Sequence, residues 1–184
     1  MRRLVPLLLG VLALAGCGPD PVPSKSSPTA PTESKDDPRK NPCHPGCFPA
    51  GTLVNTPSGV REIQSVRKGE NVSIIAADGT IASGSVESVF ETCNTLLDLT
   101  TDAGTLRTTE TQPLCLASGG FVEAGHLKRG DRIWKWVDAK RTAATVSAID
   151  KIEGTSAVFN LVVGTEKVFV ANGFLARGKP PQDR

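Results

Sequence analysis

Short apolar stretches rich in β-branched residues, separated by turn residues, fill the chain from residue 52 onward. No stretch keeps a helical apolar period over three turns, so the pattern predicts strands and not helices. We therefore expect an all-β fold. The strands are predicted over residues 52–56, 71–77, 80–92, 95–101, 105–109, 132–137, 143–152, 156–163 and 166–171.

The turns between these strands carry glycine, as tight hairpins require. Residues 169–176, FVANGFLA, give the strongest hairpin signal, because Asn172-Gly173 suits a two-residue turn with positive φ. Tight hairpins between long strands predict a compact sandwich or disc whose strands bend between layers.

The sequence also contains an internal repeat. GVREIQSVRKGENV at residues 59–72 aligns without gaps to GFVEAGHLKRGDRI at residues 120–133. Glycine, glutamate, an apolar residue, a basic residue, a second glycine, an acid and a closing aliphatic recur at the same offsets. The repeat predicts two related halves, each with a loop that leads into a strand.

The beginning of the chain differs in character and predicts export to a bacterial membrane. Two arginines precede an apolar run, residues 4–15, that is too short for a stable membrane span. The run ends in LAGC, the pattern of a bacterial lipoprotein signal, so residues 1–16 would be removed and Cys17 acylated. The alternative is an ordinary secretory signal cut nearby. A lipid on Cys17 would anchor the protein to the membrane, in the periplasm or at the cell surface.

Between this signal and the strands, residues 18–42 contain almost nothing that could build a core. Such a composition does not offset the entropy of ordering, and its prolines keep the chain extended. We therefore expect a lipid-anchored disordered linker over residues 17–42, a folded domain over 43–178 and a disordered tail over 179–184.

Charge and composition exclude one class of partner. The formal net charge is +2, the basic residues alternate with acidic ones, and aromatic residues make up 4% of the chain. A nucleic-acid-binding surface needs clustered basic residues and aromatic rings for stacking. We expect no nucleic-acid partner.

Beyond Cys17, the cysteines are Cys43, Cys47, Cys93 and Cys115. An exported compartment permits disulfides, so Cys93 with Cys115, or Cys43 with either, is compatible with the sequence, which does not fix the pairing. The motif Cys43-His44-x-x-Cys47 also raises the question of zinc. Its spacing is not that of paired Cys-x-x-Cys ligands, and we expect no metal and no cofactor.

The junction Gly46–Cys47 is the candidate site for chemistry. A thiol at the first residue of a domain is placed to attack the carbonyl before it, and a cysteine thiolate is a good nucleophile. Gly46 offers no side chain, which predicts an open approach. The reaction also needs donors for the oxyanion and a proton for the amide nitrogen. The alternative for Cys47 is a buried structural thiol or a disulfide with Cys43.

Three segments together resemble the Hint superfamily, which includes inteins, hedgehog autoprocessing domains and bacterial toxin-associated Hint domains. Residues 47–72 resemble its first motif, 106–133 its second and 158–178 its C-terminal motifs. The resemblance covers the whole folded part and implies an all-β Hint-like horseshoe of two pseudo-symmetric halves. This expectation agrees with the repeat.

The resemblance implies self-processing, with the protein's own upstream peptide as the substrate. Cys47 would be the nucleophile, Gly46–Cys47 the scissile bond, and Thr109 a hydrogen-bonding partner of that peptide. Gln112 stands where the family has a histidine, and an amide cannot serve as an acid near neutral pH. His44 is a candidate substitute acid, whereas His126 is expected to be a solvated loop residue.

The end of the chain departs from the family pattern as well. Glu166 stands where many members have histidine, and Arg177-Gly178 replaces the closing His-Asn pair. Together with the lack of an obvious segment beyond residue 184, this predicts no true splicing. Two hypotheses remain: a single-turnover cysteine autoprotease that cleaves before Cys47, and a degenerate Hint-fold module used on the cell envelope for binding or structure.

Overall fold

Strands make up nearly all of the regular secondary structure in the described part of the chain. The computed structural model describes residues 46–164 and 167–180. Within them, a 13-stranded sheet is accompanied only by two 3-10 helices of three residues each, so the all-β prediction is confirmed. The elements are β1 (Phe48–Pro49), β2 (Leu53–Thr56), β3 (Gly59–Glu62), η1 (Ile63–Ser65), β4 (Asn71–Ile75), β5 (Ile81–Ser85), β6 (Ser88–Thr101), β7 (Gly104–Thr108), β8 (Pro113–Cys115), β9 (Phe121–Glu123), η2 (Ala124–His126), β10 (Arg132–Val137), β11 (Lys140–Val162), β12 (Val168–Ala171) and β13 (Phe174–Arg177).

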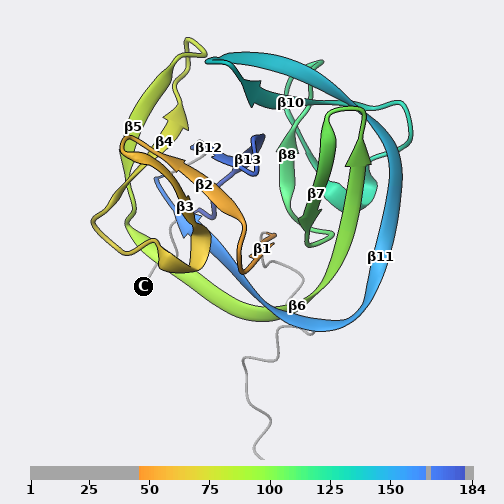
Figure 1. Ribbon diagram of the computed structural model, residues 1–184, viewed down its shortest axis with the longest axis horizontal. Coiled ribbons are helices and arrows are strands. Elements are labelled where there is room, and N and C mark those ends of the chain that lie inside the picture. The colour runs from red at the N-terminus through yellow and green to blue at the C-terminus, as the bar shows by residue number, and fades with distance from the viewer. Residues whose placement is uncertain (1–45, 165–166, 181–184) are drawn as a thin grey trace, which may run out of the picture. The chain divides into compact units, whose positions relative to one another are not determined.

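Two long strands, β6 and β11, form the longest ladder of the sheet. They pair antiparallel over most of their length, and Figure 1 shows the two ribbons running side by side in a wide curve. The register shifts at two points. The second shift lies between Ile152 and Ser156, where Gly154 has a φ of 85° that a bulge of this kind accommodates.

Two predicted strand boundaries are wrong, for reasons that the hydrogen bonds show. The segment 80–92 holds the whole of β5 and the start of β6, because the hydrogen-bond partner changes between them. The Val86 N–H donates to the carbonyl oxygen of Glu70, next to β4, whereas the Glu87 N–H donates to that of Val162 in β11, both at 2.8 Å. The segments 143–152 and 156–163 form the single strand β11, because the bulge between them lets pairing with β6 resume. Local sequence cannot show whether a glycine ends a strand or only bulges it.

The predicted hairpin over 169–176 is confirmed as β12 and β13. Its turn residues, Asn172 and Gly173, have φ values of 46° and 81°. The hairpin lies in the middle of the view in Figure 1. It pairs through β12 with β2 and through β13 with β8, so it stands between the strand pairs β2–β3 and β8–β9.

The two repeated segments predicted from the sequence are built alike. β3 and η1 in the first half correspond to β9 and η2 in the second, and a tight turn follows each 3-10 helix. In the first turn, the N–H of Arg67 donates to Glu70 Oε2 at 2.8 Å; in the second, the N–H of Lys128 donates to Asp131 Oδ2 at 2.8 Å. These matched hydrogen bonds confirm the internal repeat.

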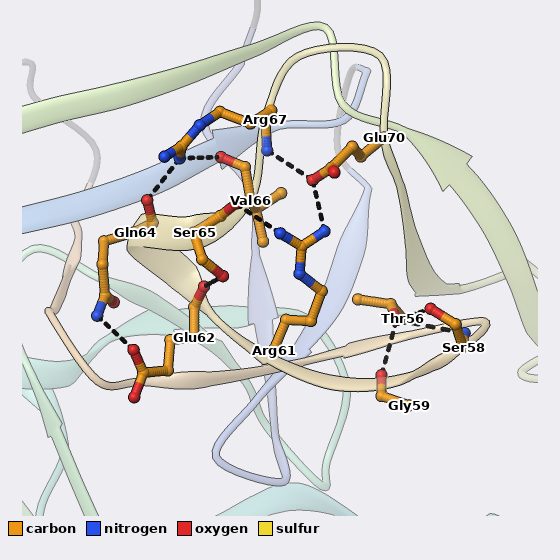
Figure 2. A network of polar contacts seen from close by, with 10 residues as sticks. All are labelled: Thr56, Ser58, Gly59, Arg61, Glu62, Gln64, Ser65, Val66, Arg67 and Glu70. Carbon is orange, nitrogen blue, oxygen red and sulfur yellow. Dashed lines mark hydrogen bonds and ion pairs between the residues drawn. The ribbon is translucent and has the colours of Figure 1, made fainter.

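A polar network reinforces the loop of the first half alone (Figure 2). The Arg61 guanidinium donates to the carbonyl oxygen of Ser65 at 2.7 Å and pairs with the Glu70 carboxylate at 2.8 Å. The hydrogen bond from Arg61, and then the one from the Arg67 N–H, hold the pKa of Glu70 below its usual range. Val122 occupies the position of Arg61 in the second half, so the two loops share a backbone but not this network.

A continuous apolar core lies between the strands and ties the first strand to the central hairpin. Phe48 of β1 and Phe169 of β12 are both fully buried. Their rings meet edge to face, with centroids 6.0 Å apart and planes at 77°. Aromatic pairs prefer this geometry, so the contact fixes β1 against β12.

The packed region extends beyond the predicted end of the domain. Residue 179 was expected to begin a disordered tail, yet Lys179 is only 1% exposed and its N–H donates to the carbonyl oxygen of Leu161 at 2.9 Å. The prediction is wrong at this position because β11 offers a backbone acceptor that the local composition does not reveal. The predicted signal and linker lie outside the described residues.

Replacing the central aromatic of this core tests its role. Phe169→Ala removes a fully buried ring and is expected to lower the free energy of unfolding by about 3–5 kcal/mol. Val60→Ala, at a side chain that is 60% exposed, is the control and should change it by less than about 0.5 kcal/mol. Urea denaturation followed by tryptophan fluorescence measures both, and equal losses would contradict the packing described.

Candidate functional site

The Gly46–Cys47 peptide is buried where the chain enters β1. β1 pairs antiparallel with β11, with Phe48 opposite Phe159. The same register sets Cys47 beside the next residue of β11, Asn160. Cys47 is only 2% exposed, so the strand pairing carries the candidate scissile bond into the interior.

Backbone and threonine groups at the end of β7 hold the peptide units around this bond. The Cys47 N–H donates to Thr109 Oγ1 at 2.8 Å. The Cys47 carbonyl oxygen accepts from Thr108 Oγ1 at 2.8 Å and from the Thr109 N–H at 3.0 Å. The Gly46 N–H donates to the carbonyl oxygen of Thr111 at 3.1 Å. The structure thus places Thr109 against the amide nitrogen of the candidate scissile bond.

The carbonyl oxygen of the same bond faces Asn160, which the sequence analysis did not single out. Asn160 Nδ2 donates to the Gly46 carbonyl oxygen. Asn160 is fully buried, and its Oδ1 accepts from the Leu161 N–H at 2.7 Å, which fixes the direction of the amide. A lone amide inside the apolar stretch VFNLVV was the available signal, because a buried polar side chain needs a partner.

Gln112 is also fully buried, and its side chain joins three segments. Its Oε1 accepts from Asn160 Nδ2 at 3.2 Å, and its Nε2 donates to the carbonyl oxygens of Arg177 and Pro113, both at 3.0 Å. The Gln112 side chain therefore acts on the Gly46 carbonyl through Asn160. It also ties the entry to β1 to the end of β13.

Gly46 does not give the open approach that we expected. A Cβ atom at this position would lie 1.9 Å from Gln112 Cα and 2.0 Å from Gln112 N. Real Cβ atoms essentially never come this close to backbone. The absence of a side chain at Gly46 lets the Gln112 backbone pack against the candidate scissile bond, and the expectation of free access was wrong.

Two buried titratable groups interact at this site. Burial raises the pKa of the Cys47 thiol to about 12, against an opposing effect of the positive charge of Lys179. Burial likewise lowers the pKa of Lys179, whose Nζ lies 2.9 Å from the centroid of the Phe90 ring. Burial therefore shifts the pKa of both groups in the direction of the neutral form. Sequence reasoning missed Lys179 because it lies in a polar, proline-containing tail.

The remaining candidates lie elsewhere or outside the described residues. His126 is exposed on η2, 3.5 Å from a Glu123 carboxylate oxygen, as expected of a solvated residue. Cys93 and Cys115 are free thiols, so the disulfide between them that the sequence left open is not formed. Cys17, Cys43, His44 and Glu166 fall outside the description.

The described part of the chain offers neither a metal-binding cluster nor a membrane-spanning helix. No group of three or more His, Cys, Asp or Glu side chains in residues 46–164 and 167–180 could hold a metal ion. No helix in the same part of the chain is long and apolar enough to cross a membrane.

Comparison of structures finds proteins with the same fold, whereas comparison of sequences finds no match. No protein-family model and no curated protein matches the chain. A DnaB intein from Synechocystis sp. PCC 6803 superposes with a TM-score of 0.66 at 20% identity, over 73% of this chain and 99% of the intein. A bacterial intein-like domain from Clostridium thermocellum gives 0.62 at 23% identity, over 72% and 98%. The gp41-1 intein gives 0.58 at 22% identity, over 71% and 97%.

These likenesses show that the domain has the Hint fold of inteins. The fold expected from the three sequence motifs is therefore confirmed. At these identities the comparisons concern the fold alone, and the chemistry has to be argued from the site.

The hydrogen bond from the Cys47 N–H to Thr109 can be tested by its effect on stability. Thr109→Val takes away the acceptor of the Cys47 N–H inside the domain and is expected to cost about 1–3 kcal/mol of unfolding free energy. Thr108→Val is the matched control, because the Cys47 carbonyl oxygen keeps the Thr109 N–H as a donor. Urea denaturation compares the two, and an equal or larger loss for Thr108→Val would contradict the arrangement.

Proposed function

We propose that the domain cleaves its own chain at Gly46–Cys47 by an N-to-S acyl shift. The observation that carries the proposal is the hydrogen bond from the buried Asn160 amide to the Gly46 carbonyl oxygen. In the shift, Cys47 Sγ bonds to the Gly46 carbonyl carbon, the C–N bond breaks, and the thiol proton ends on the Cys47 nitrogen. The product is a thioester that water or another nucleophile resolves.

Asn160 would stabilise the charge that develops on the Gly46 oxygen. A donor that is already aimed at this oxygen in a buried site stabilises the oxyanion without reorganising. Gln112 acts as a positioning residue, since its Oε1 accepts a hydrogen bond from Asn160 Nδ2. This role differs from that of an acid, which an amide cannot fill.

Thr109 would serve the leaving nitrogen. Its hydroxyl oxygen lies 2.8 Å from the Cys47 nitrogen. This hydrogen bond orients the peptide bond that the thiol attacks. The amide resonance resists cleavage, so the nitrogen needs a proton as the C–N bond breaks. The Thr109 hydroxyl stands beside that nitrogen and can relay the proton.

The small ionised fraction of the Cys47 thiol limits the rate of the acyl shift. With a pKa of about 12, only about one Cys47 thiol in 100,000 is ionised at pH 7. The acyl shift should therefore be slow at neutral pH and accelerate as the pH rises. The fold shared with inteins supports self-processing as the class of reaction.

The reaction would have a consequence at the membrane if the chain is a lipoprotein. We propose that the segment before Cys17 is an export signal and that lipid on Cys17 anchors the chain to the bacterial envelope. The chain's own segment upstream of Cys47 would then be both tether and substrate. Hydrolysis of the thioester would release the domain from the membrane.

Two observations favour a second function. The raised pKa of Cys47 and the amide of Gln112 in place of an acid both oppose fast catalysis. A domain that kept the Hint fold without the reaction would serve as a binding or structural module. In that case the hydrogen bonds around Gly46 would only anchor the domain's first residues.

Thioester trapping distinguishes these functions. The full chain with Cys17→Ser is incubated with hydroxylamine, and intact mass spectrometry follows the fragment that begins at Cys47. The fragment is expected to appear, to form about tenfold faster per pH unit between pH 7 and 9, and to vanish in Cys47→Ala.

Cys115→Ala is the matched control for this measurement, because burial also raises the pKa of the Cys115 thiol to about 12. It should leave the fragment's yield unchanged. A chain that keeps its full mass and gains no free amino terminus at Cys47 in any condition would reject self-processing and support the binding module.

Restoring an acid at the glutamine position should accelerate the reaction. Gln112→His introduces a group that can donate a proton near neutral pH, and the expected gain in cleavage rate is about 10²–10⁴-fold. Gln112→Leu, which removes one of the two acceptors of Asn160 Nδ2, should be slower than the wild type. The rates come from the same mass measurement, and a folded Gln112→His variant no faster than the wild type would count against a missing acid as the cause of slow cleavage.

A further inference from the structure

Lys179 is a buried amine whose presence the fold does not explain. The residue is 1% exposed, and among the described residues its Nζ has no hydrogen-bond partner. Burying an amine without an acceptor is costly, and such groups concentrate at functional sites. The contact of Nζ with the Phe90 ring offsets part of this cost.

The amine lies in the same cluster as the candidate nucleophile. Phe90 packs against the small apolar cluster formed by Cys47, Leu96 and Val158. Lys179 Nζ covers the ring of that same Phe90. The positive charge of Lys179 also works against the rise in the pKa of the Cys47 thiol, so the two groups interact electrostatically.

The backbone around Lys179 is fixed next to the group that binds the scissile carbonyl. The Lys179 N–H donates to the carbonyl oxygen of Leu161 at 2.9 Å, and the preceding residue, Gly178, donates to the carbonyl oxygen of Lys167 at 2.9 Å. Leu161 directly follows Asn160, whose amide binds the Gly46 oxygen. Two adjacent residues of β11 therefore bind the two reacting parts: Asn160 binds the Gly46 carbonyl, and Leu161 binds the backbone of Lys179.

We propose that Lys179 Nζ is the acceptor of the acyl group, so that processing joins Gly46 to the Lys179 side chain through an isopeptide bond. The inference rests on the proposed acyl shift, which supplies the thioester. A desolvated lysine in an apolar pocket is a competent nucleophile, because its neutral form carries a free electron pair. Holding the two groups in one buried site raises their effective concentration.

The step balances without water, oxidant or cofactor. The Nζ electron pair forms a C–N bond to the Gly46 carbonyl carbon, and the C–Sγ bond breaks. A proton passes from Nζ to the Cys47 sulfur, which leaves as a thiol. The overall change converts one amide into another, frees the Cys47 α-amine and leaves the mass of the chain unaltered.

The product differs from that of hydrolysis. Hydrolysis would separate the domain from everything before Cys47. Transfer to Lys179 would instead leave the upstream segment attached through a side chain, with a new amino terminus at Cys47. The domain would stay tethered although its main chain had been cut.

The test uses the full chain with Cys17→Ser, which is incubated at pH 8.5, digested and analysed by tandem mass spectrometry. The expected result is a branched peptide that joins the Gly46 carbonyl to Lys179 Nζ, together with a free amine on Cys47. The branched peptide should fall below detection in Lys179→Arg and in Cys47→Ala. Lys167→Arg, at an exposed lysine, is the matched control and should leave its yield unchanged.

Hydroxylamine separates failure of this inference from failure of the acyl shift. In Lys179→Arg, the cleaved fragment that begins at Cys47 should still form with hydroxylamine, because the thioester then lacks its internal acceptor. A second outcome is that the chain that keeps Lys179 is cleaved by hydroxylamine and yet gives no branched peptide. That result would overturn the lysine as acceptor and leave the acyl shift intact. If neither cleavage nor a branched peptide is observed, both the acyl shift and the lysine acceptor are overturned. A branched peptide that joins Gly46 to another residue in Lys179→Arg would place the acceptor elsewhere.

Discussion

The antiparallel pairing of β6 with β11 is the constraint on which the rest of the structure depends. The ladder extends along most of both strands, and β11 also pairs with β1 and β10. One strand therefore fixes the entry of the domain and receives its last residues. Because the Asn160 amide and the Leu161 carbonyl are neighbours on that strand, the beginning and the end of the folded chain meet at one buried point.

Much of the fold could be predicted because its signals are local. Strand segments, the Asn172-Gly173 hairpin and the repeat follow from residue type and spacing, and the structure confirms them. The extent of β11 could not be predicted, because the effect of Gly154 depends on whether a partner strand continues beyond it.

The site was predictable only in part, for a related physical reason. Cys47 and Thr109 stand in motifs with recognisable spacing, and the structure brings them into contact. Asn160 and Lys179 owe their importance to pairings between distant segments, which no short window contains. Gly46 shows the same limit, since its openness was inferred from its own lack of a side chain while the crowding comes from Gln112.

The close approach of the Gln112 backbone to Gly46 has a consequence for portability. Because no Cβ atom fits at that position, the domain selects the residue that precedes it by shape. A cargo protein fused ahead of Cys47 would be compatible with the folded junction only if its last residue were glycine. The domain is thus matched to the glycine before Cys47, and its transfer to another protein would require that this glycine be carried along.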